Sequence, residues 1–365
     1  MTRSLKICVL GAVTAPHVVA RAEVFRRFGH DVSLVSPVPG SVDGMAVAAP
    51  ARRFGLFERY ARFADIIRLV ASQRADIYHA HYAADPTTWA AWICRKRPLV
   101  VSVMGGDVLF EEQGTLGWLG RALTRSSLRA ANLVTVKSAL LAERVRAYGV
   151  APQHVRVVIW GVDRRLFFPR PEDRSKTRRA WNVPDDAFLV FSPRALQPLY
   201  NQEILVEALA RVPDAILAIS TNRADAGYQR RIQQKAASLG LSGRVVLVPD
   251  IAFSDMAFAY SAADLVISIP SSDGFPQSVL EAAACGVPVV MSNLERYREL
   301  LEHQASAYFT AISPPAVASA LRTMMEHPDR RQAMAAAAMA IVAERCDFDE
   351  QAAMVEAEFQ RLAGA

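Results

Sequence analysis

Short runs rich in β-branched residues alternate along the whole chain with amphipathic helical patterns, and this order constrains the fold more than any other feature. The strand candidates form a first series at 6–11, 31–36, 75–81, 98–107, 131–138 and 155–161, and a second series at 187–194, 215–220, 244–250, 263–272 and 287–293. Helical patterns lie between them, for example at 17–29, 87–97, 201–212 and 228–240. Strands that alternate with helices are typical of an α/β protein with parallel sheets.

Between the two series, at 160–179, the sequence WGVDRRLFFPRPEDRSKTRR contains two prolines, many charges and little hydrophobic periodicity. Such a segment is typical of an interdomain linker. At 365 residues the chain is also long for a single hydrophobic core. We therefore predict two doubly wound, Rossmann-like domains in series, at 1–165 and 166–345, followed by a last amphipathic helix within 346–365.

Composition narrows the class of protein. Hydrophobic residues make up 52% of the chain and charged residues 21%, as in a globular protein. No apolar run reaches the roughly 18 residues of a membrane-spanning helix, and the first residues do not resemble a signal peptide. The four cysteines are scattered, which disfavours a disulfide framework or a zinc site, so we expect a cytoplasmic protein. The net charge of +6 is spread over many segments and favours anionic small ligands, or an anionic membrane surface, over nucleic acid.

In doubly wound domains ligands bind beyond the carboxyl ends of the strands, so the residues that follow each strand are the candidates for function. After the first strand, Gly11 does not begin a dinucleotide fingerprint, because Val13 and Pro16 stand where glycines would be needed. Gly11 still lets a ligand approach the backbone, and His17 opens the next helix. The alternative is that Gly11 only turns the chain and that His17 lies on a surface.

Asp107 follows the fourth strand and a pair of glycines, where its carboxylate could accept hydrogen bonds from ligand hydroxyls. Alternatively it is the N-cap of the next helix. His79 and His81 alternate on a strand and therefore share a face, but no third zinc ligand lies near them in the sequence. We expect His81, at the strand's end, to line a cleft and His79 to pack in the core.

In the second domain, Arg194 comes directly after a strand and Asn201 stands at the expected cap of a helix. A guanidinium at a strand end can hold two phosphate oxygens with its planar fork. An exposed surface arginine is the alternative.

The segment SSDGFPQSVLEAAACGVPVV, at 271–290, is the most informative stretch. Pro276 suits the first turn of a helix, so we expect the helix to begin at 275–276, with free N–H groups near Gln277, Ser278 and Val279 that attract an anion. Glu281 lies about 6 Å further along the axis, roughly the step from a diphosphate to its ribose. Asp273, on the preceding loop, would then reach the group beyond the phosphates. The alternative is a helix whose glutamate is solvated.

These residues carry a resemblance to a family. The segment PSSDGFPQSVLEAAACGVPVV resembles the carboxylate-x7-glutamate segment of family 4 glycosyltransferases. VIWGVDRRLFFP, at 158–169, is similar to the family's linker, and SAADLVISIPSS, at 261–272, to its Ala-Asp strand. HAHYA, the glycine-rich turn before Asp107 and the final helix match in position, so the resemblance covers most of the chain.

The resemblance implies the GT-B fold, in which an N-terminal acceptor domain and a C-terminal donor domain face each other across a cleft. It also implies that the last helix crosses back to the first domain. The implied activity is retaining transfer of a hexosyl group from a nucleoside diphosphate sugar to a hydroxyl on a glycan, a lipid-linked glycan or a small molecule. Neither a metal nor another cofactor is expected.

Roles follow from the resemblance by position. It assigns Glu281 to the ribose, Asp273 to the donor sugar and Arg194 to the diphosphate. The expected donor-binding residues are Gly11, Arg194, Asn201, Asp273, Gly274, Phe275, Pro276, Gln277, Ser278, Val279 and Glu281. The expected catalytic residues are Asp107, Arg194 and Asp273, and the expected acceptor-binding residues are His17 and His81.

Three positions depart from the family pattern. Asp273 replaces the usual glutamate and is shorter by one methylene. The lysine that normally follows Arg194 by a few residues is absent, and Tyr200 and Asn201 occupy that region. Met104 stands where the family often has a histidine. All three changes affect the expected geometry around the donor.

No carboxylate is clearly placed as a nucleophile, so we expect a front-face reaction in which the departing phosphate takes the acceptor proton. Two alternatives remain, a nucleotide-sugar epimerase and a binding protein that kept the fold without turnover. The patterns at 52–70 and 114–129 combine arginines with apolar residues, as in helices that lie on the inner face of a membrane. Helices packed on their own sheet with a solvated basic face would show the same pattern.

Overall fold

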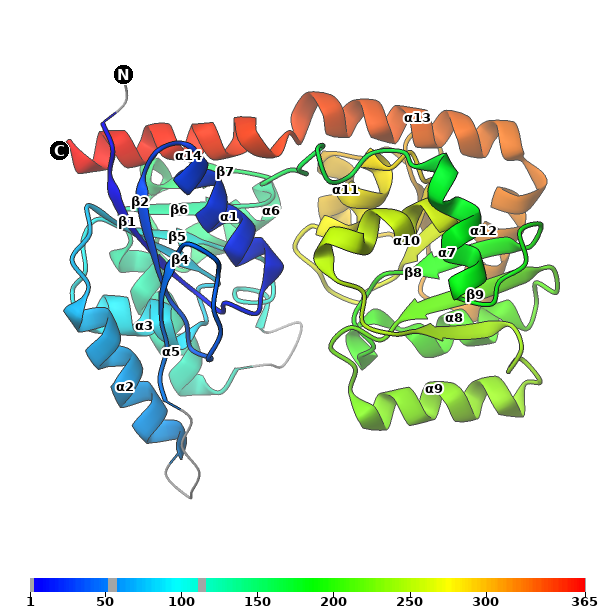
Figure 1. Cartoon of the computed structure of the whole chain (residues 1–365), viewed down its shortest axis with the longest axis horizontal. Coiled ribbons are helices and arrows are strands. Elements are labelled where there is room, and N and C mark those ends of the chain that lie inside the picture. Colours follow the sequence, from blue (N-terminus) through cyan, green and yellow to red (C-terminus); the bar gives the residue numbers. More distant parts are fainter. Residues whose placement is uncertain (1–2, 52–57, 111–115, 365) are drawn as a thin grey trace. The chain divides into compact units, whose positions relative to one another are not determined.

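The computed structural model describes residues 3–51, 58–110 and 116–364 (Figure 1). The chain divides into two compact units. Unit 1 comprises Met1–Trp160 together with Asp349–Ala365, and unit 2 comprises Gly161–Phe348. The boundaries expected from the sequence stood at 165 and 345.

Unit 1 contains a seven-stranded parallel sheet in the order β3-β2-β1-β4-β5-β6-β7. Its strands are β1 (Lys6–Leu10), β2 (Asp31–Val35), β3 (Ala46–Ala48), β4 (Ile77–His81), β5 (Leu99–Ser102), β6 (Leu133–Val136) and β7 (Val155–Val157). Its helices are α1 (Pro16–Arg27), α2 (Glu58–Ser72), α3 (Pro86–Ile93), α5 (Trp118–Ala130), α6 (Ala139–Ala147) and the 3-10 turn η1 (Pro152–His154), with α14 (Phe348–Ala363) added from the C-terminus. Helices α1 and α14 cover one face of the sheet, and α2, α3 and α5 cover the other (Figure 1).

Helix α14 is attached to unit 1 by a buried aromatic contact and by polar contacts at its surface. Phe359 is fully buried, with its ring centroid 4.9 Å from that of Phe25 on α1. Asp349 pairs with Arg27 at 2.8 Å, but both side chains are well exposed. Burying a phenylalanine side chain contributes roughly 1.5–3 kcal/mol, whereas an exposed ion pair contributes about 0–1 kcal/mol. Apolar burial therefore holds this helix.

Unit 2 contains a six-stranded parallel sheet in the order β10-β9-β8-β11-β12-β13. Its strands are β8 (Phe188–Ser192), β9 (Ala215–Ser220), β10 (Val245–Val248), β11 (Leu265–Ser268), β12 (Val289–Ser292) and β13 (Tyr308–Thr310). Its helices are α7 (Arg174–Ala180), α8 (Gln202–Leu209), α9 (Ala226–Ser238), α10 (Met256–Ala262), α11 (Gln277–Ala284), α12 (Pro314–Glu326) and α13 (Pro328–Arg345). Short 3-10 turns are η2 (Pro171–Asp173), η3 (Pro198–Tyr200), η4 (Phe253–Asp255) and η5 (Glu295–Glu299).

The prediction of two doubly wound parallel α/β domains is confirmed, and every strand predicted from the sequence is present. The two strands that were not predicted, β3 and β13, are three residues long and lie at sheet edges. The three-residue strand β7 could be predicted because it begins a longer β-branched run, whereas β3 and β13 stand in no such run and show no pattern.

The end of the segment interpreted as a linker is in fact structured, because 174–180 forms α7. Arg178 is fully buried and donates to Asp264 at 2.7 Å, while Arg174 donates to the same carboxylate at 2.6 Å. Burial lowers the pKa of Arg178, and the charge of Asp264 opposes that shift. A run of arginines reads as a solvated surface in the sequence, since nothing local reveals the carboxylate that it meets.

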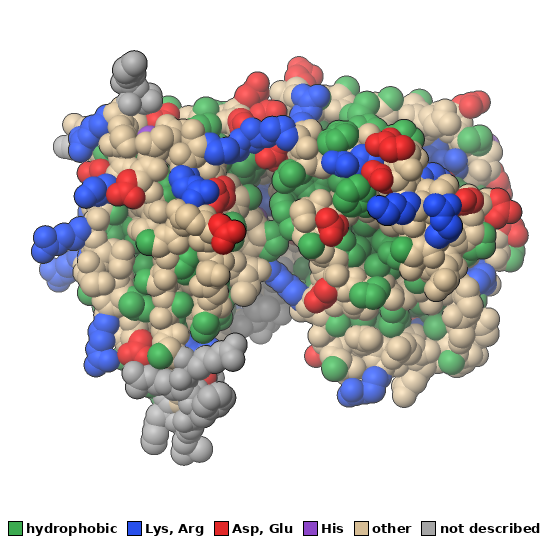
Figure 2. Space-filling model, viewed as in Figure 1, with side chains coloured by type: hydrophobic (Ala, Val, Ile, Leu, Met, Phe, Trp, Pro, Cys, Tyr) green, Lys and Arg blue, Asp and Glu red, His purple; other side chains and the backbone are tan. Residues whose placement is uncertain are grey.

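No helix of the described ranges is long and apolar enough to cross a membrane. On the face visible in Figure 2, basic and acidic side chains lie interspersed over both units. This distribution agrees with the mild and scattered positive charge of the sequence.

A tight backbone crossing at Gly161 gives a first testable prediction. A Cβ on Gly161, where φ is +36°, would lie 2.0 Å from the carbonyl oxygen of Cys346. The next N–H, of Val162, donates to that same oxygen at 2.7 Å, so neither segment can move away without losing a hydrogen bond. We expect Gly161→Ala to lower the free energy of unfolding by about 3 kcal/mol or more, measured by urea denaturation.

Gly240→Ala is the matched control. Gly240 also has a positive φ, of +68°, but nothing lies within 4 Å of its hypothetical Cβ. It should therefore lose only the left-handed backbone penalty, about 1–2 kcal/mol. Equal losses for the two variants would show that the crossing is not tight.

Candidate functional site

The N-terminus of α11 forms the centre of the candidate site. Pro276 is the N-cap, with φ −73° and ψ 115°, so the helix begins one position later than the sequence indicated. The N–H groups of Gln277 and Ser278 have no partner among the described residues, whereas that of Val279 donates to the Pro276 carbonyl at 3.1 Å. Unpaired N–H groups at the positive end of a helix dipole attract anions. Two amides, rather than the expected three, are free for this purpose.

Arg194 lies beside these amides, two residues after β8 ends. Its Nη1 donates to Ser278 Oγ at 3.3 Å and its Nη2 to Asp273 Oδ2 at 2.8 Å. The side chains of Arg194 and Asp273 are only 12% and 15% exposed, which contradicts the alternative of a surface arginine. Burial acts to lower the pKa of Arg194, but Asp273 together with Tyr200 and Tyr297 outweighs it, so that pKa lies above its ordinary value. The guanidinium is thus held charged at the helix terminus.

Tyr200 and Asn201 stand where the family pattern has a lysine. The Arg194 guanidinium lies over the Tyr200 ring at 4.4 Å, so an aromatic face contacts the cation where a second cation was expected. Asn201 has left-handed backbone angles and makes no side-chain cap bond to α8. Instead its Nδ2 donates to the Ile269 carbonyl at 2.8 Å and to Ser271 Oγ at 2.9 Å. Asn201 therefore fixes the loop that leads to Asp273.

The loop before α11 is held from several sides. Arg296 Nη1 donates to the backbone carbonyl of Asp273, and Gln277 Nε2 donates to the carbonyl of Gly161. Phe275 packs edge-on against Tyr297, with ring centroids 5.5 Å apart. Gly274 is buried between these anchored positions. Such contacts pre-organise the free amides before a ligand arrives.

Glu281 lies one turn into α11 and is only 5% exposed, so the alternative of a solvated glutamate is wrong. Its Oε2 accepts a hydrogen bond of 2.8 Å from the hydroxyl of Tyr260, at the end of α10. Burial and the charge of Glu281 raise the pKa of Tyr260 well above its ordinary value. The tyrosine therefore keeps its proton and orients the carboxylate.

Asp107 is placed differently from the prediction. It is fully buried, and its two oxygens accept three backbone N–H bonds, from Ala83 at 2.7 Å, Met104 at 3.0 Å and Gly105 at 2.8 Å. Burial raises the pKa of Asp107, and these N–H bonds oppose the shift. Nor is Asp107 the cap of an α-helix. Because backbone donors already use this carboxylate, the geometry argues against a catalytic contact and favours a role in joining the loops after β4 and β5.

The remaining predicted residues of unit 1 meet at the ends of β1 and β4. A Cβ on Gly11 would lie 3.3 Å from His81 Cβ and from both Val18 methyl groups, so the bare backbone packs directly on the histidine. His81 and His79 are both buried, with ring centroids 4.1 Å apart. His79 Nε2 bonds to Ser102 Oγ at 2.9 Å, as a core histidine would. His17, in the first turn of α1, is partly buried and lowers the pKa of His81 as a minor contributor after burial.

Three residues that contact the predicted site residues were not predicted from the sequence. They are Arg21, which contacts His81, Tyr260, which contacts Glu281, and Arg296, which contacts Asp273. For Arg21 a signal existed, because positions 17, 21 and 25 fall on one helical face and place Arg21 in line with the buried Phe25. For Tyr260 and Arg296 no local signal existed, because their partners are distant in the sequence. Tyr260 donates to the Glu281 carboxylate, and Arg296 donates to the Asp273 carbonyl.

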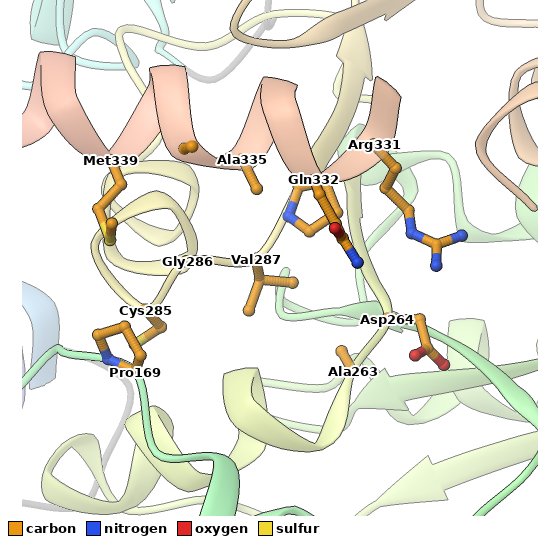
Figure 3. A pocket seen from close by; sticks show the side chains of 12 residues that line it. Pro169, Ala263, Asp264, Cys285, Gly286, Val287, Arg331, Gln332, Ala335 and Met339 are labelled. Atoms are coloured by element: carbon orange, nitrogen blue, oxygen red, sulfur yellow. The ribbon is translucent and has the colours of Figure 1, made fainter. Parts of the chain in front are cut away.

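Neither a cluster of metal ligands nor a neighbouring cavity extends this site within the described residues. Within the described ranges, no three His, Cys, Asp or Glu side chains gather as metal ligands would. A cavity of about 380 Å³ opens at the opposite end of α11, between Cys285–Pro288 and α13 (Figure 3). Its walls are mostly apolar, and its one carboxylate, that of Asp264, is already paired with two arginines.

Comparisons with known proteins bear on this arrangement. The model of a family described as glycosyl transferases group 1 matches residues 173–340, and that of a glycosyl transferase 4-like domain matches residues 14–161. A D-inositol 3-phosphate glycosyltransferase of Catenulispora acidiphila is 29% identical over 72% of this chain and 67% of its own length. The corresponding enzyme of Mycobacterium tuberculosis is 29% identical over 73% of this chain, which spans only 59% of that relative.

Solved structures agree on the fold. Sucrose-phosphate synthase from Thermosynechococcus elongatus superposes with a TM-score of 0.85 at 18% identity, covering 99% of each chain. HepE from Anabaena, in complex with UDP-glucose, superposes with a TM-score of 0.83 at 23% identity, covering 97% of this chain and all of the other. These likenesses show the GT-B fold.

Proposed function

The chain belongs to the group 1, family 4-like glycosyltransferases, and we propose that it transfers a sugar, with retention, from a nucleoside diphosphate sugar to a hydroxyl acceptor. One observation carries the proposal. Two N–H groups at the start of α11, unpaired among the described residues, lie beside a charged arginine whose side chain is 12% exposed, and a buried glutamate follows one turn later. A diphosphate fits the free N–H groups and the arginine, and a ribose fits the glutamate.

The electrostatics of the site support catalysis as well as binding. Negative charge grows on the leaving phosphate as the glycosidic bond breaks, so the fixed N–H dipoles of Gln277 and Ser278 and the charge of Arg194 stabilise the transition state. The diphosphate competes with Asp273 for the Arg194 guanidinium, which frees the Asp273 carboxylate to accept from the hydroxyls of the donor sugar. With Asp107 occupied by backbone donors, we retain the front-face route, in which the departing phosphate takes the acceptor proton.

The donor screen tests this proposal. Thermal shifts with UDP-, GDP-, ADP- and dTDP-sugars would identify the base, because a ligand that binds the folded state raises the melting temperature. UDP-glucose is the first donor to try, since the similar HepE structure contains it. We expect one nucleotide series to stabilise the protein, and its nucleoside diphosphate to be released only when an acceptor is present to take the sugar. Donor conversion without acceptor would indicate an epimerase, and stabilisation without turnover on any acceptor a binding protein.

Tyr260→Phe is expected to weaken the ribose contact without unfolding the protein. The variant keeps the ring but removes the hydroxyl that holds Glu281 Oε2 at 2.8 Å. We predict a rise in donor KM of roughly tenfold, as the loss of a hydrogen bond to a charged group implies, with kcat changed less. The preference for the donor over its 2′-deoxyribose analogue separates the two explanations, because a general packing defect would leave this preference unchanged. That preference should shrink in Tyr260→Phe, and an unchanged preference would contradict the positioning role.

We also propose membrane association. It now rests on the exposed start of α5 and no longer on both arginine-rich patterns of the sequence. Within α5, the Arg125 guanidinium lies over the Tyr148 ring of its own unit, whereas Trp118 and Leu119 at the helix start are 82% and 54% exposed. An exposed Trp-Leu pair can insert into a lipid interface. Residues 52–57 of the first pattern and 114–115 of the second lie outside the described residues. We expect Trp118→Ser to reduce co-sedimentation with anionic liposomes, and equal sedimentation of variant and wild type would reject the proposal.

A further inference from the structure

A buried guanidinium, that of Arg21, lies at the carboxyl ends of the strands of unit 1. Arg21 is 2% exposed. Its Nη1 lies 3.1 Å from Nδ1 of His81, the last residue of β4, and 3.3 Å from Sδ of Met104, which follows β5. Its guanidinium carbon is 4.2 Å from the centroid of the Trp160 ring. We call these four residues the Arg21 cluster.

The Arg21 cluster contains a cation without a counter-ion. The structure records no ion pair between Arg21 and any described carboxylate, and its Nε and Nη2 form no hydrogen bond to the described residues. Two other arginines with little exposed side chain do have a counter-ion, since Arg178 pairs with Asp264 and Arg194 pairs with Asp273. Burial lowers the pKa of Arg21 to about 9. An uncompensated buried charge is unfavourable, and an anion brought to it would offset that penalty.

His81 adds a second unsatisfied donor. Burial lowers the pKa of His81 far below its ordinary value, and the charges of His79 and Arg21 contribute, so the ring is neutral. Because Arg21 can only donate, His81 Nδ1 is the acceptor of their contact, and the single ring proton must reside on Nε2. That Nε2 is buried and has no hydrogen-bond partner within the part of the chain that the structure describes. The 12-residue helix α1 also begins at this end of the sheet and adds the positive end of its dipole.

We propose that the Arg21 cluster is a subsite for an anionic group, a phosphate or a carboxylate, carried by the acceptor. The proposal rests on the proposed function in one respect, that the acceptor binds to unit 1. The groups of the cluster that remain without an acceptor among the described residues are Nε and Nη2 of Arg21 and Nε2 of His81, and all of them are hydrogen-bond donors. An anion is therefore favoured as the ligand over a cation or a neutral hydroxyl. The unusual methionine at position 104 fits the same role, since a thioether beside Arg21 leaves the positive charge unneutralised.

Inorganic phosphate is the probe, observed by phosphorus NMR in the presence of saturating nucleoside diphosphate, which occupies the α11 terminus. We expect the wild type to bind phosphate under these conditions. Arg21→Met should weaken that binding at least tenfold. Arg27→Met is the matched control, because Arg27 lies on the same helix but is exposed and paired with Asp349, and it should change the affinity less than twofold. Arg21→Met should melt no lower than the wild type when phosphate is absent, since it removes an unpaired buried charge.

Three results would overturn the proposal. The first is no phosphate binding once the nucleotide site is filled, and the second is unchanged binding by Arg21→Met. The third is a comparable loss of nucleoside diphosphate affinity in Arg21→Met, because the anion at Arg21 would then be the donor's own diphosphate. If Arg21→Met does not fold, Arg21→Lys replaces it, and a point charge without the fork should weaken phosphate binding partially. If no nucleotide binds at all, the proposed function fails separately, and the titration is run on Arg194→Met, which removes the cation at the α11 terminus.

Discussion

Replacing Arg194 by methionine is expected to lower kcat for sugar transfer by roughly 100- to 1000-fold, the range seen when one preorganised electrostatic group is removed from a transition state. Among the described residues, Arg194 is the one guanidinium that donates to the first turn of α11, through Ser278. Without it, charge developing on the leaving phosphate meets only the backbone dipoles. The effect should therefore appear in kcat and not only in KM.

Controls must separate this loss from a folding defect, because Arg194→Met leaves the largely buried Asp273 carboxylate without its partner at 2.8 Å. The double variant Arg194→Met with Asp273→Asn removes both charges, so it should recover stability without recovering activity. Arg194→Lys should recover part of the rate, since an ammonium supplies charge but not the planar fork. A kcat for Arg194→Met within tenfold of wild type would contradict the role of Arg194.

The second large effect concerns stability and not catalysis. Asp107→Ala leaves the N–H groups of Ala83, Met104 and Gly105 without their acceptor inside the protein. Each unsatisfied buried donor costs about 1–3 kcal/mol, so we expect the variant to lose on the order of 3–5 kcal/mol. That is a large share of the roughly 5–15 kcal/mol by which a domain is stable. Denaturant unfolding followed by tryptophan fluorescence would measure the loss.

Asp107→Asn refines the same test. An amide retains one acceptor oxygen but turns an NH2 group toward a backbone donor, so its loss of stability should be smaller than that of alanine and still clear. Donor KM of the folded fraction should remain close to that of the wild type. A variant that is as stable as the wild type but inactive would restore the catalytic role that the sequence suggested for Asp107.

These two residues show what the sequence could and could not predict. The strands were predictable because β-branched runs are a local signal, and the start of α11 was predictable because Pro276 and Glu281 carry local chemistry. The role of Asp107 was not, since three amides from two loops converge on it only after folding. The same limit applies to Arg178, which a charge-rich run presents as surface and the fold buries against Asp264.

One physical reason explains why the sequence could not predict which side chains contact each other across the fold. A helical or strand period tells which face a side chain occupies, but it does not tell what lies opposite that face. Tyr260 opposite Glu281, and His81 opposite Arg21, are therefore findings of the structure. The broken glycine fingerprint was an exception, because an absence of glycines at fixed spacing can be read from the sequence alone.

Hydrogen–deuterium exchange in the presence of the preferred nucleoside diphosphate tests the central claim most directly. The claim is that the diphosphate binds to the free amides of Gln277 and Ser278 and the ribose to Glu281. We predict that the nucleotide slows exchange in a peptide covering 271–284, and that Glu281→Gln reduces this protection at equal nucleotide concentration. Nucleotide binding that protects other peptides while 271–284 exchanges as in the free protein would contradict the account.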